Sequence, residues 1–148
     1  MGKTIIISNR LPVKIEQENN ELVYKASEGG LATGLNSVFK QGNNLWVGWP
    51  GLAIEKAQEE EVHAKLIEQH MKPVFLSSEE IEDFYEGFSN ETLWPNFHYF
   101  NQYTVYKEEL WLAYQRVNQK FAEIVSEELE EDDTVWIHDY QLLLLPQL

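Results

Sequence analysis

The sequence predicts an α/β fold, with a parallel sheet, flanking helices and one inserted β-hairpin. Short apolar segments alternate with helical segments along all 148 residues, which is the pattern of parallel strands joined by right-handed crossovers. Two polar motifs, Ser8-Asn9-Arg10 and His138-Asp139, each follow a predicted strand. Because ligands bind beyond the carboxyl ends of the strands in open sheets, we expect these motifs to meet at one rim.

The first predicted elements are a strand, a hairpin and a helix. Residues 4–8 are apolar and β-branched, as in a buried strand. Residues 13–15 and 22–24 are two apolar runs separated by a polar stretch, which predicts a hairpin. A helix is expected over residues 29–40, and three apolar side chains share one of its faces: Leu31, Leu35 and Val38.

The next elements alternate again between strand and helix. Residues 45–49 form an apolar run that Pro50-Gly51 ends, which predicts a strand. Residues 55–70 are rich in Glu and Lys, which indicates a helix with a solvated face. A short strand is then expected at residues 74–76.

An aromatic segment follows. Ser77 and Glu80 have the spacing of a capping box, so a helix is predicted from about residue 78 to residue 87. Glycine, serine, asparagine and proline then break the periodicity and predict a loop. The large aromatic side chains in and around it are Tyr85, Phe88, Trp94 and Phe97. Core packing is the default role of such a cluster, but aromatics on a loop also suit a binding site, as does Trp49 at the end of its strand.

The longest helix is predicted over residues 103–129, and a central strand is predicted at residues 134–137. A stripe of apolar side chains recurs every three or four positions along the helix. Its members are Tyr103, Tyr106, Leu110, Tyr114, Val117, Phe121 and Ile124.

Arg10 and Gly29-Gly30 are the first candidate site residues. A guanidinium can hold an oxyanion by two hydrogen bonds, so Arg10 is a candidate phosphate ligand. A surface ion pair in this acidic chain is the alternative. Glycines at a helix start let an anion approach the free N–H groups closely, although plain turn chemistry is the commoner reason for such a pair.

His138 and Asp139 form the second candidate group. Asp139 can accept hydrogen bonds from two sugar hydroxyls, or it can cap the turn that follows. His138 suits acid–base chemistry or hydroxyl recognition, but a buried, hydrogen-bonded histidine is the commoner case. No metal site is expected, because metal-ligand spacing is lacking at the other histidines, His63, His70 and His98.

The composition argues against several classes of protein. Eleven basic and 25 acidic residues give a formal net charge of −14, which disfavours binding to nucleic acid or to anionic membranes. There is no cysteine, which fits the reducing cytoplasm where we expect the protein. The sequence holds no apolar run of about 18 residues, and a signal peptide is not expected. The apolar end at residues 141–148 predicts that the natural protein continues.

Five segments resemble trehalose-6-phosphate synthases, in the family's order and at compatible spacing. They are Ser8-Asn9-Arg10, residues 27–34, Trp46-Val47-Gly48-Trp49, residues 88–95 with His98-Tyr99, and Trp136-Ile137-His138-Asp139-Tyr140. The resemblance covers essentially the whole chain. It implies a retaining GT-B glycosyltransferase that moves glucose from UDP-glucose to glucose 6-phosphate without a metal or other cofactor. Residues 1–148 would be the incomplete, Rossmann-like, acceptor-side part of its N-terminal domain.

The resemblance also implies roles for individual positions. Arg10 would contact the phosphate of the acceptor, and Asp139 would bind acceptor hydroxyls. Three aromatic side chains would complete the acceptor pocket: Trp49, Tyr85 and Trp94. Gly29 and Gly30 would lie beside the sugar diphosphate of the donor. No side chain would act as a nucleophile, so catalysis would rest on positioning and electrostatics.

The chain departs from the family pattern at one point. It ends before the family's next motif, a His-Ile-Pro-Phe-Pro segment, and it lacks the second domain, which in the family holds the uridine and the leaving diphosphate. We therefore expect residues 1–148 alone to be inactive. The sequence leaves three alternatives undecided, the first being that the full-length protein forms a homo-oligomer. The second is a transferase with another phosphorylated acceptor, such as glycerol 3-phosphate. The third is a non-catalytic homologue that senses sugar phosphates.

Overall fold

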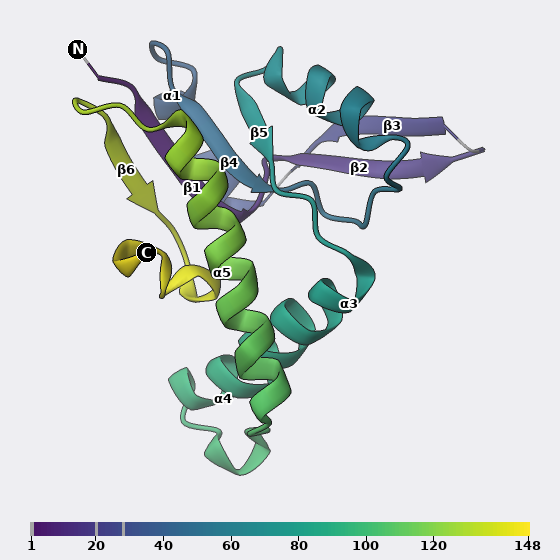
Figure 1. The fold of residues 1–148 in the computed structure, drawn as a ribbon, viewed down its shortest axis with the longest axis vertical. Helices are drawn as coiled ribbons and strands as arrows, with labels where there is room; N and C mark the ends of the chain where they lie inside the picture. The colour runs from purple at the N-terminus through teal and green to yellow at the C-terminus, as the bar shows by residue number, and fades with distance from the viewer. Residues whose placement is uncertain (1, 20, 28) are drawn as a thin grey trace.

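Four parallel strands form the main sheet of the computed structural model, which describes residues 2–19, 21–27 and 29–148 (Figure 1). In spatial order they are β5 (Met71–Pro73), β4 (Leu45–Trp49), β1 (Thr4–Arg10) and β6 (Thr134–Ile137). In the middle of the sheet, Ile6 of β1 pairs with Trp46 on one side and with Trp136 on the other. The predicted α/β fold with a parallel sheet is confirmed.

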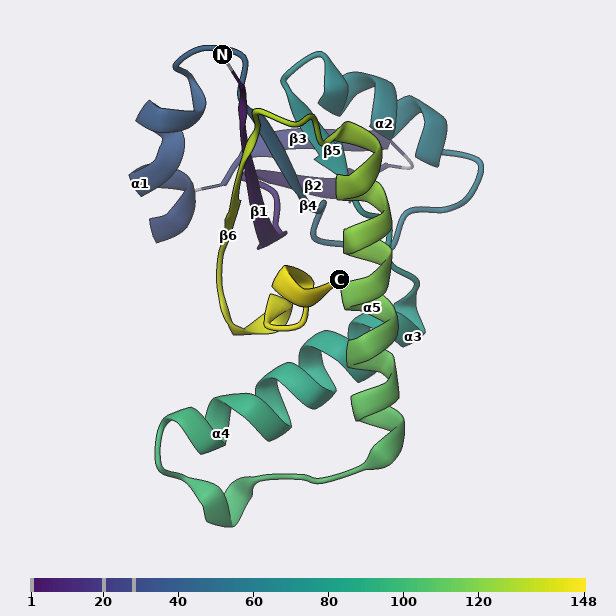
Figure 2. The same cartoon turned by 60° about the vertical axis from the view of Figure 1, so that its left-hand side comes forward.

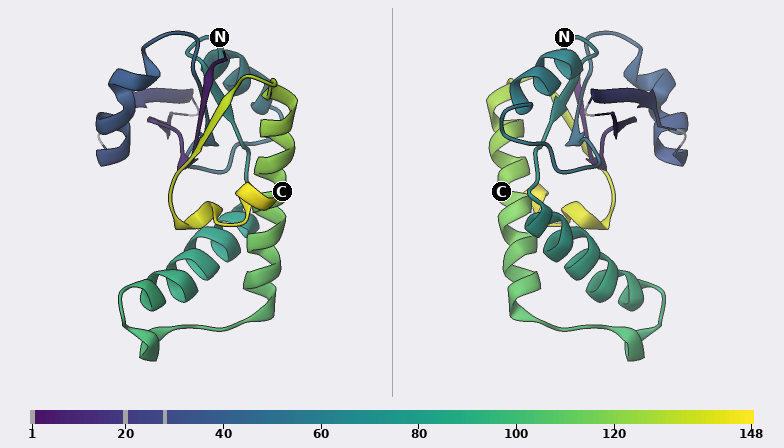
Figure 3. Two further views of the ribbon diagram at one scale, coloured as in Figure 1. Left: turned by 90° about the vertical axis from the view of Figure 1, so that its left-hand side faces the viewer. Right: turned by 90° about the vertical axis from the view of Figure 1, so that its right-hand side faces the viewer.

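The side chains of β1 alternate between two hydrophobic cores, as strand geometry requires. Ile5 and Ile7 pack in the core that α5 (Glu108–Glu128) covers, whereas Ile6 packs in the core beneath α2 (Glu59–Ile67). All three side chains are completely buried, and each such burial is worth roughly 1.5–3 kcal/mol. Figure 2 shows α1 and α5 on opposite sides of the sheet, and Figure 3 shows the hairpin on the same side as α1.

The hairpin consists of β2 (Val13–Glu18) and β3 (Glu21–Ala26), and its antiparallel pairing confirms the prediction. Helix α1 (Gly30–Phe39) follows close to its predicted bounds. Of the three apolar residues predicted to share one face of α1, Leu35 is buried in the core. Leu31 and Val38 are each 37% exposed.

The aromatic segment is helical throughout, so the predicted loop is wrong. Helix α3 (Ser78–Glu80) runs into the π-helix η1 (Ile81–Leu93) and then into α4 (Trp94–Phe97). The predicted capping box is present, with Ser77 Oγ accepting from the Glu80 N–H and the Glu80 carboxylate accepting from the Ser77 N–H.

Two contacts explain why the helix passes the residues that predicted a break. The Ser89 hydroxyl donates to the Phe84 carbonyl, five residues earlier, across 2.7 Å, which suits the wider π turn. Pro95 cannot donate to the Glu91 carbonyl, and this carbonyl accepts instead from the Val105 N–H across 2.9 Å.

Helix α5 begins five residues later than predicted. Tyr103 and Tyr106, which fitted the periodicity, precede it and are 69% and 74% exposed. The stripe is confirmed from its third member onward. Its buried members are Leu110, Tyr114, Val117 and Phe121.

Two further strand predictions need correction. β5 lies at residues 71–73 and not at residues 74–76, because only the Val74 N–H of the later run continues the pairing, with the Gly48 carbonyl of β4. β6 lies at an edge of the described sheet and is not central, so Val135 and Trp136 are 38% and 42% exposed.

The last described residues form two short 3₁₀ turns, η3 (Tyr140–Leu142) and η4 (Leu145–Gln147), against α5. Leu142 and Leu145 of this apolar run are buried there in the core. Among the described helices, none has the length and the apolar character needed to cross a membrane.

Candidate functional site

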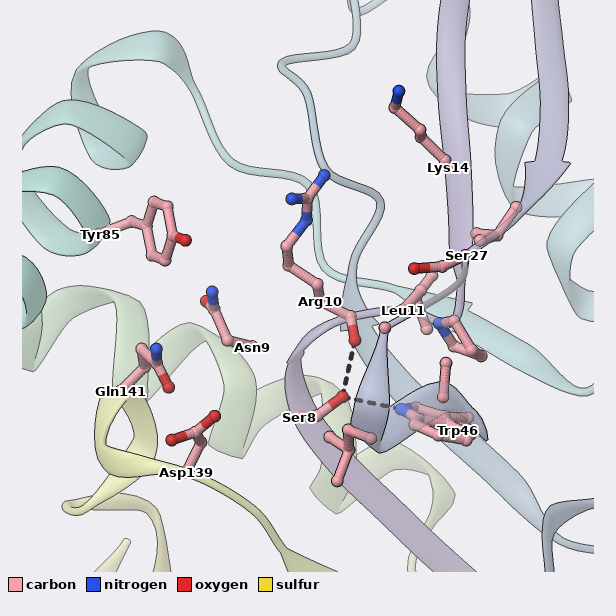
Figure 4. Close-up of a pocket in the computed structure, with 15 residues that line it drawn as sticks. Ser8, Asn9, Arg10, Leu11, Lys14, Ser27, Trp46, Tyr85, Asp139 and Gln141 are labelled. Atoms are coloured by element: carbon pink, nitrogen blue, oxygen red, sulfur yellow. Dashed lines mark hydrogen bonds between the residues drawn. The ribbon is translucent and has the colours of Figure 1, made fainter. Parts of the chain in front are cut away.

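The ends of β1 and β6 lie side by side and bring Arg10 and Asp139 to one cavity. Ile7 pairs with Ile137 in parallel register, and the His138 N–H donates to the Ile7 carbonyl across 2.8 Å. A cavity of about 330 Å³ lies at this rim (Figure 4). The predicted site residues that line it are Arg10, Gly29, Tyr85 and Asp139. The expected meeting of the two strand ends at one rim is therefore observed.

Arg10 is the last residue of β1, and its neighbours hold it at both its backbone and its guanidinium. A bulge after Ile7 brings Arg10 opposite Trp49 of β4. The Arg10 carbonyl accepts from Ser8 Oγ across 2.7 Å, and Ser8 Oγ accepts from Trp46 Nε1 across 2.8 Å. The guanidinium carbon lies 5.3 Å from the centre of the Trp49 ring, within cation–π range.

The structure shows no carboxylate paired with the guanidinium of Arg10 among the residues that it describes. Within the described ranges, no carboxylate oxygen lies within the 4.0 Å of an ion pair with it. In Figure 4 the guanidinium points away from Asp139. The cavity therefore has a cationic end and an anionic end, and the surface ion pair considered for Arg10 is not found in residues 2–19, 21–27 and 29–148.

Asp139 occupies a strained backbone position. Its φ of 78° and ψ of 161° lie in a region that is close to exclusive for glycine. Its side chain accepts a hydrogen bond from the Tyr140 N–H across 3.1 Å, so the predicted cap is present. The same exposed carboxylate also lines the cavity, so capping and ligand binding are compatible. Strain held at a cavity wall is typical of a functional residue.

Two amide side chains at the cavity escaped the sequence analysis. Asn9 and Gln141 are 6% and 5% exposed and line the cavity, and each has a side-chain oxygen without a partner among the described residues. A buried acceptor without a partner costs about 1–3 kcal/mol, so a ligand that donates hydrogen bonds would relieve a real cost. Asn9 precedes Arg10 and Gln141 follows Asp139 by two residues, but nothing in the local sequence marks either amide as part of a cavity wall.

The other predicted site residues lie elsewhere. Trp49 is 4% exposed and lies behind Arg10, with its ring centre 5.7 Å from that of Tyr85. Trp94 is 48% exposed and packs on His98 and Tyr140, at ring-centre distances of 3.8 and 5.7 Å. In the described part of the chain, neither tryptophan lines this cavity. Gly30 does not line it either, since only Gly29 of the pair reaches the wall.

Burial affects the titration of His138 next to the rim. It lowers the pKa of His138 below the ordinary value of 6.5, and the nearby Asp139 carboxylate opposes this shift in part. His138 Nε2 has no hydrogen-bond partner in the described ranges, so the satisfied histidine considered from the sequence is not formed. Among the described residues, no three or more His, Cys, Asp or Glu side chains cluster so that they could hold a metal ion.

The family model of glycosyltransferase family 20 matches residues 2–148. The chain belongs to this family. It is 38% identical over 149 residues to the α,α-trehalose-phosphate synthase (UDP-forming) of Botryotinia fuckeliana, and the match covers 99% of the chain but 28% of that synthase. The chain thus spans less than a third of the length of this family 20 relative.

Solved structures match almost the whole chain. A Burkholderia xenovorans α,α-trehalose-phosphate synthase (UDP-forming) in complex with glucose-6-phosphate matches with a TM-score of 0.74 and 31% identity, over 99% of this chain and 30% of that one. A trehalose-6-phosphate structure from E. coli bound with UDP-2-fluoro glucose matches with a TM-score of 0.73 and 27% identity, over 99% and 29% of the two chains.

Proposed function

We propose that the protein is a UDP-forming α,α-trehalose-phosphate synthase and that this chain is the acceptor-side part of its N-terminal domain. The enzyme transfers glucose from UDP-glucose to glucose 6-phosphate, with retention at the anomeric carbon. The observation that carries the proposal is the cavity lined by Arg10 at one end and Asp139 at the other, with no described carboxylate paired to Arg10. A sugar phosphate has matching ends, an oxyanion and a row of hydroxyls. Two of the matched structures support both substrates, since one is a complex with glucose-6-phosphate and the other is bound with UDP-2-fluoro glucose.

The acceptor is held by charge at one end and by hydrogen bonds at the other. Arg10 donates two hydrogen bonds to the phosphate, and Tyr85 adds its hydroxyl from η1. Asp139 accepts hydrogen bonds from ring hydroxyls. The unpaired oxygens of Asn9 and Gln141 accept from further hydroxyls, which relieves the cost of their burial.

The donor lies on the Gly29 side of the same cavity. Helix α1 begins at Gly30, and its N-terminal end favours a diphosphate. Acceptor and donor are then held side by side, so that they react in a fixed orientation and need not meet by diffusion. The departing phosphate oxygen takes the proton of the acceptor hydroxyl on the same face, so no side-chain nucleophile is needed. We place this reaction in the cytoplasm, to which a chain without cysteine is suited.

Steady-state kinetics of the full-length protein carrying Arg10→Ala test the proposal. The lost charge-assisted hydrogen bonds should raise KM for glucose 6-phosphate roughly 10- to 100-fold and leave KM for UDP-glucose nearly unchanged. Arg116→Ala removes a cation from an exposed position on α5 and should alter neither value. A larger effect on UDP-glucose than on glucose 6-phosphate would contradict the role of Arg10. Faster transfer to glycerol 3-phosphate than to glucose 6-phosphate would contradict the proposed acceptor.

A further inference from the structure

We propose that Gly51 is a positioning residue for Arg10, because its lack of a side chain leaves the slot that the Arg10 guanidinium fills. The inference rests on the proposed function, since it takes Arg10 as the ligand of the acceptor phosphate. Gly51 lies outside the residues that line the cavity among those described. It would therefore act on the acceptor only through Arg10.

The guanidinium leaves no room for a side chain at position 51. A methyl group on Gly51 would lie 2.5 Å from Nη2 of Arg10, 3.2 Å from its Cζ and 3.3 Å from its Nε. These contacts involve three atoms of one rigid planar group, so the guanidinium has to shift as a unit to relieve them. Any side chain at this position must push the guanidinium out of its present place.

Trp49 is a second neighbour of the guanidinium. Its ring centre lies 5.3 Å from the guanidinium carbon of Arg10, and Tyr85 packs on the same ring. The Trp49 Nε1–H donates to the Leu52 carbonyl across 3.0 Å, which ties the indole to the turn that contains Gly51. The φ of Gly51 is +98°, a conformation that glycine adopts without strain.

This arrangement orients a cation without neutralising it. An aromatic face and a glycine hold the guanidinium by shape and by the ring quadrupole. Among the described residues, none accepts a hydrogen bond from the guanidinium, so its N–H groups are available to an oxyanion. A carboxylate in the same place would fix Arg10 equally well but would compete with the phosphate of the acceptor.

The test uses the full-length enzyme and two alanine substitutions at glycines of positive φ. Gly51→Ala should raise KM for glucose 6-phosphate roughly tenfold, because the charge-assisted bonds lose their geometry. Its KM for UDP-glucose and its kcat should stay within about twofold. Gly42→Ala is the matched control, since Gly42 has a φ of +78° but open space around the added methyl. It should leave all three constants unchanged.

A double variant separates positioning from general damage. In an Arg10→Ala enzyme the slot is empty, so adding Gly51→Ala should leave KM for glucose 6-phosphate at the value of Arg10→Ala alone. Multiplied effects of the two substitutions would overturn the inference, as would an unchanged KM in Gly51→Ala.

The same double variant decides the case if Gly51→Ala does not fold. Removal of the Arg10 side chain should then restore folding, to the melting temperature of Gly42→Ala, and a double variant that stays unfolded would overturn the inference. An unsubstituted enzyme that transfers nothing to glucose 6-phosphate would instead overturn the proposed function, and the inference with it.

Discussion

Replacement of Asp139 by glycine should stabilise the protein while it abolishes acceptor binding. The backbone of Asp139, with a φ of 78° and a ψ of 161°, costs a residue other than glycine about 1–3 kcal/mol. Glycine removes this cost, loses a few tenths of a kcal/mol from the cap on Tyr140, and adds about 0.5–1 kcal/mol of backbone entropy in the unfolded chain. The expected net effect is a free energy of unfolding about 1 kcal/mol higher.

Alanine at the same position gives the opposite sign. Asp139→Ala keeps the strain and loses the cap, which costs about 1 kcal/mol, so the two variants should differ by about 2 kcal/mol. Asp139→Asn is the matched control, because it keeps an oxygen for the cap and tolerates positive φ. Its stability should remain close to that of the unsubstituted protein.

Urea unfolding followed by tryptophan fluorescence measures these differences, provided the slope m is the same in all variants. The kinetics of the full-length enzyme give the second readout, and all three variants should lose affinity for glucose 6-phosphate. If Asp139→Ala proved at least as stable as Asp139→Gly, backbone strain at this position would be refuted.

Other contacts give three more predictions. The free energy of unfolding should fall as the pH drops below about 6.5, because burial lowers the pKa of His138 and the unfolded chain then binds a proton that the folded chain excludes. His138→Gln should flatten this part of the pH profile of urea unfolding. An unchanged slope in this variant would contradict the role of His138. Gly87→Ala should lower Tm, since its methyl group would lie 2.7 Å from Leu110 Cδ2. Gly34→Ala, in open space within α1, should raise the free energy of unfolding by about 0.5–1 kcal/mol. Equal changes of Tm in the two variants would contradict the packing of Gly87 against Leu110. Ser77→Ala should cost about 1 kcal/mol through loss of the capping box, and an unmoved urea midpoint would exclude this.

The sequence predicted correctly those elements whose conformation depends on residues close together in the chain. The β-branched run of β1, the two halves of the hairpin and the capping box at Ser77 depend on residues within a few positions of one another. The meeting of Arg10 and Asp139 was also predictable, although they lie far apart in the sequence. It follows from the rule that parallel strands end at one edge of a sheet.

The errors arose where distant residues decide the conformation. Pro95 predicted a break, but the carbonyl that it leaves free is bound by the Val105 N–H from beyond α4. Tyr106 fitted the period of α5, yet it lies in the segment before that helix. Asn9 and Gln141 were missed because their burial at a cavity wall depends on tertiary packing. No pattern of neighbouring residues carries this information.

The account depends most on one placement, in which Arg10 and Asp139 hold opposite ends of a single phosphorylated sugar. A crystal structure of the full-length protein with glucose 6-phosphate tests it directly. We predict the phosphate against the Arg10 guanidinium and the ring hydroxyls against the Asp139 carboxylate, in the cavity that both line. Glucose 6-phosphate bound outside this cavity, or bound with its phosphate remote from Arg10, would contradict the account.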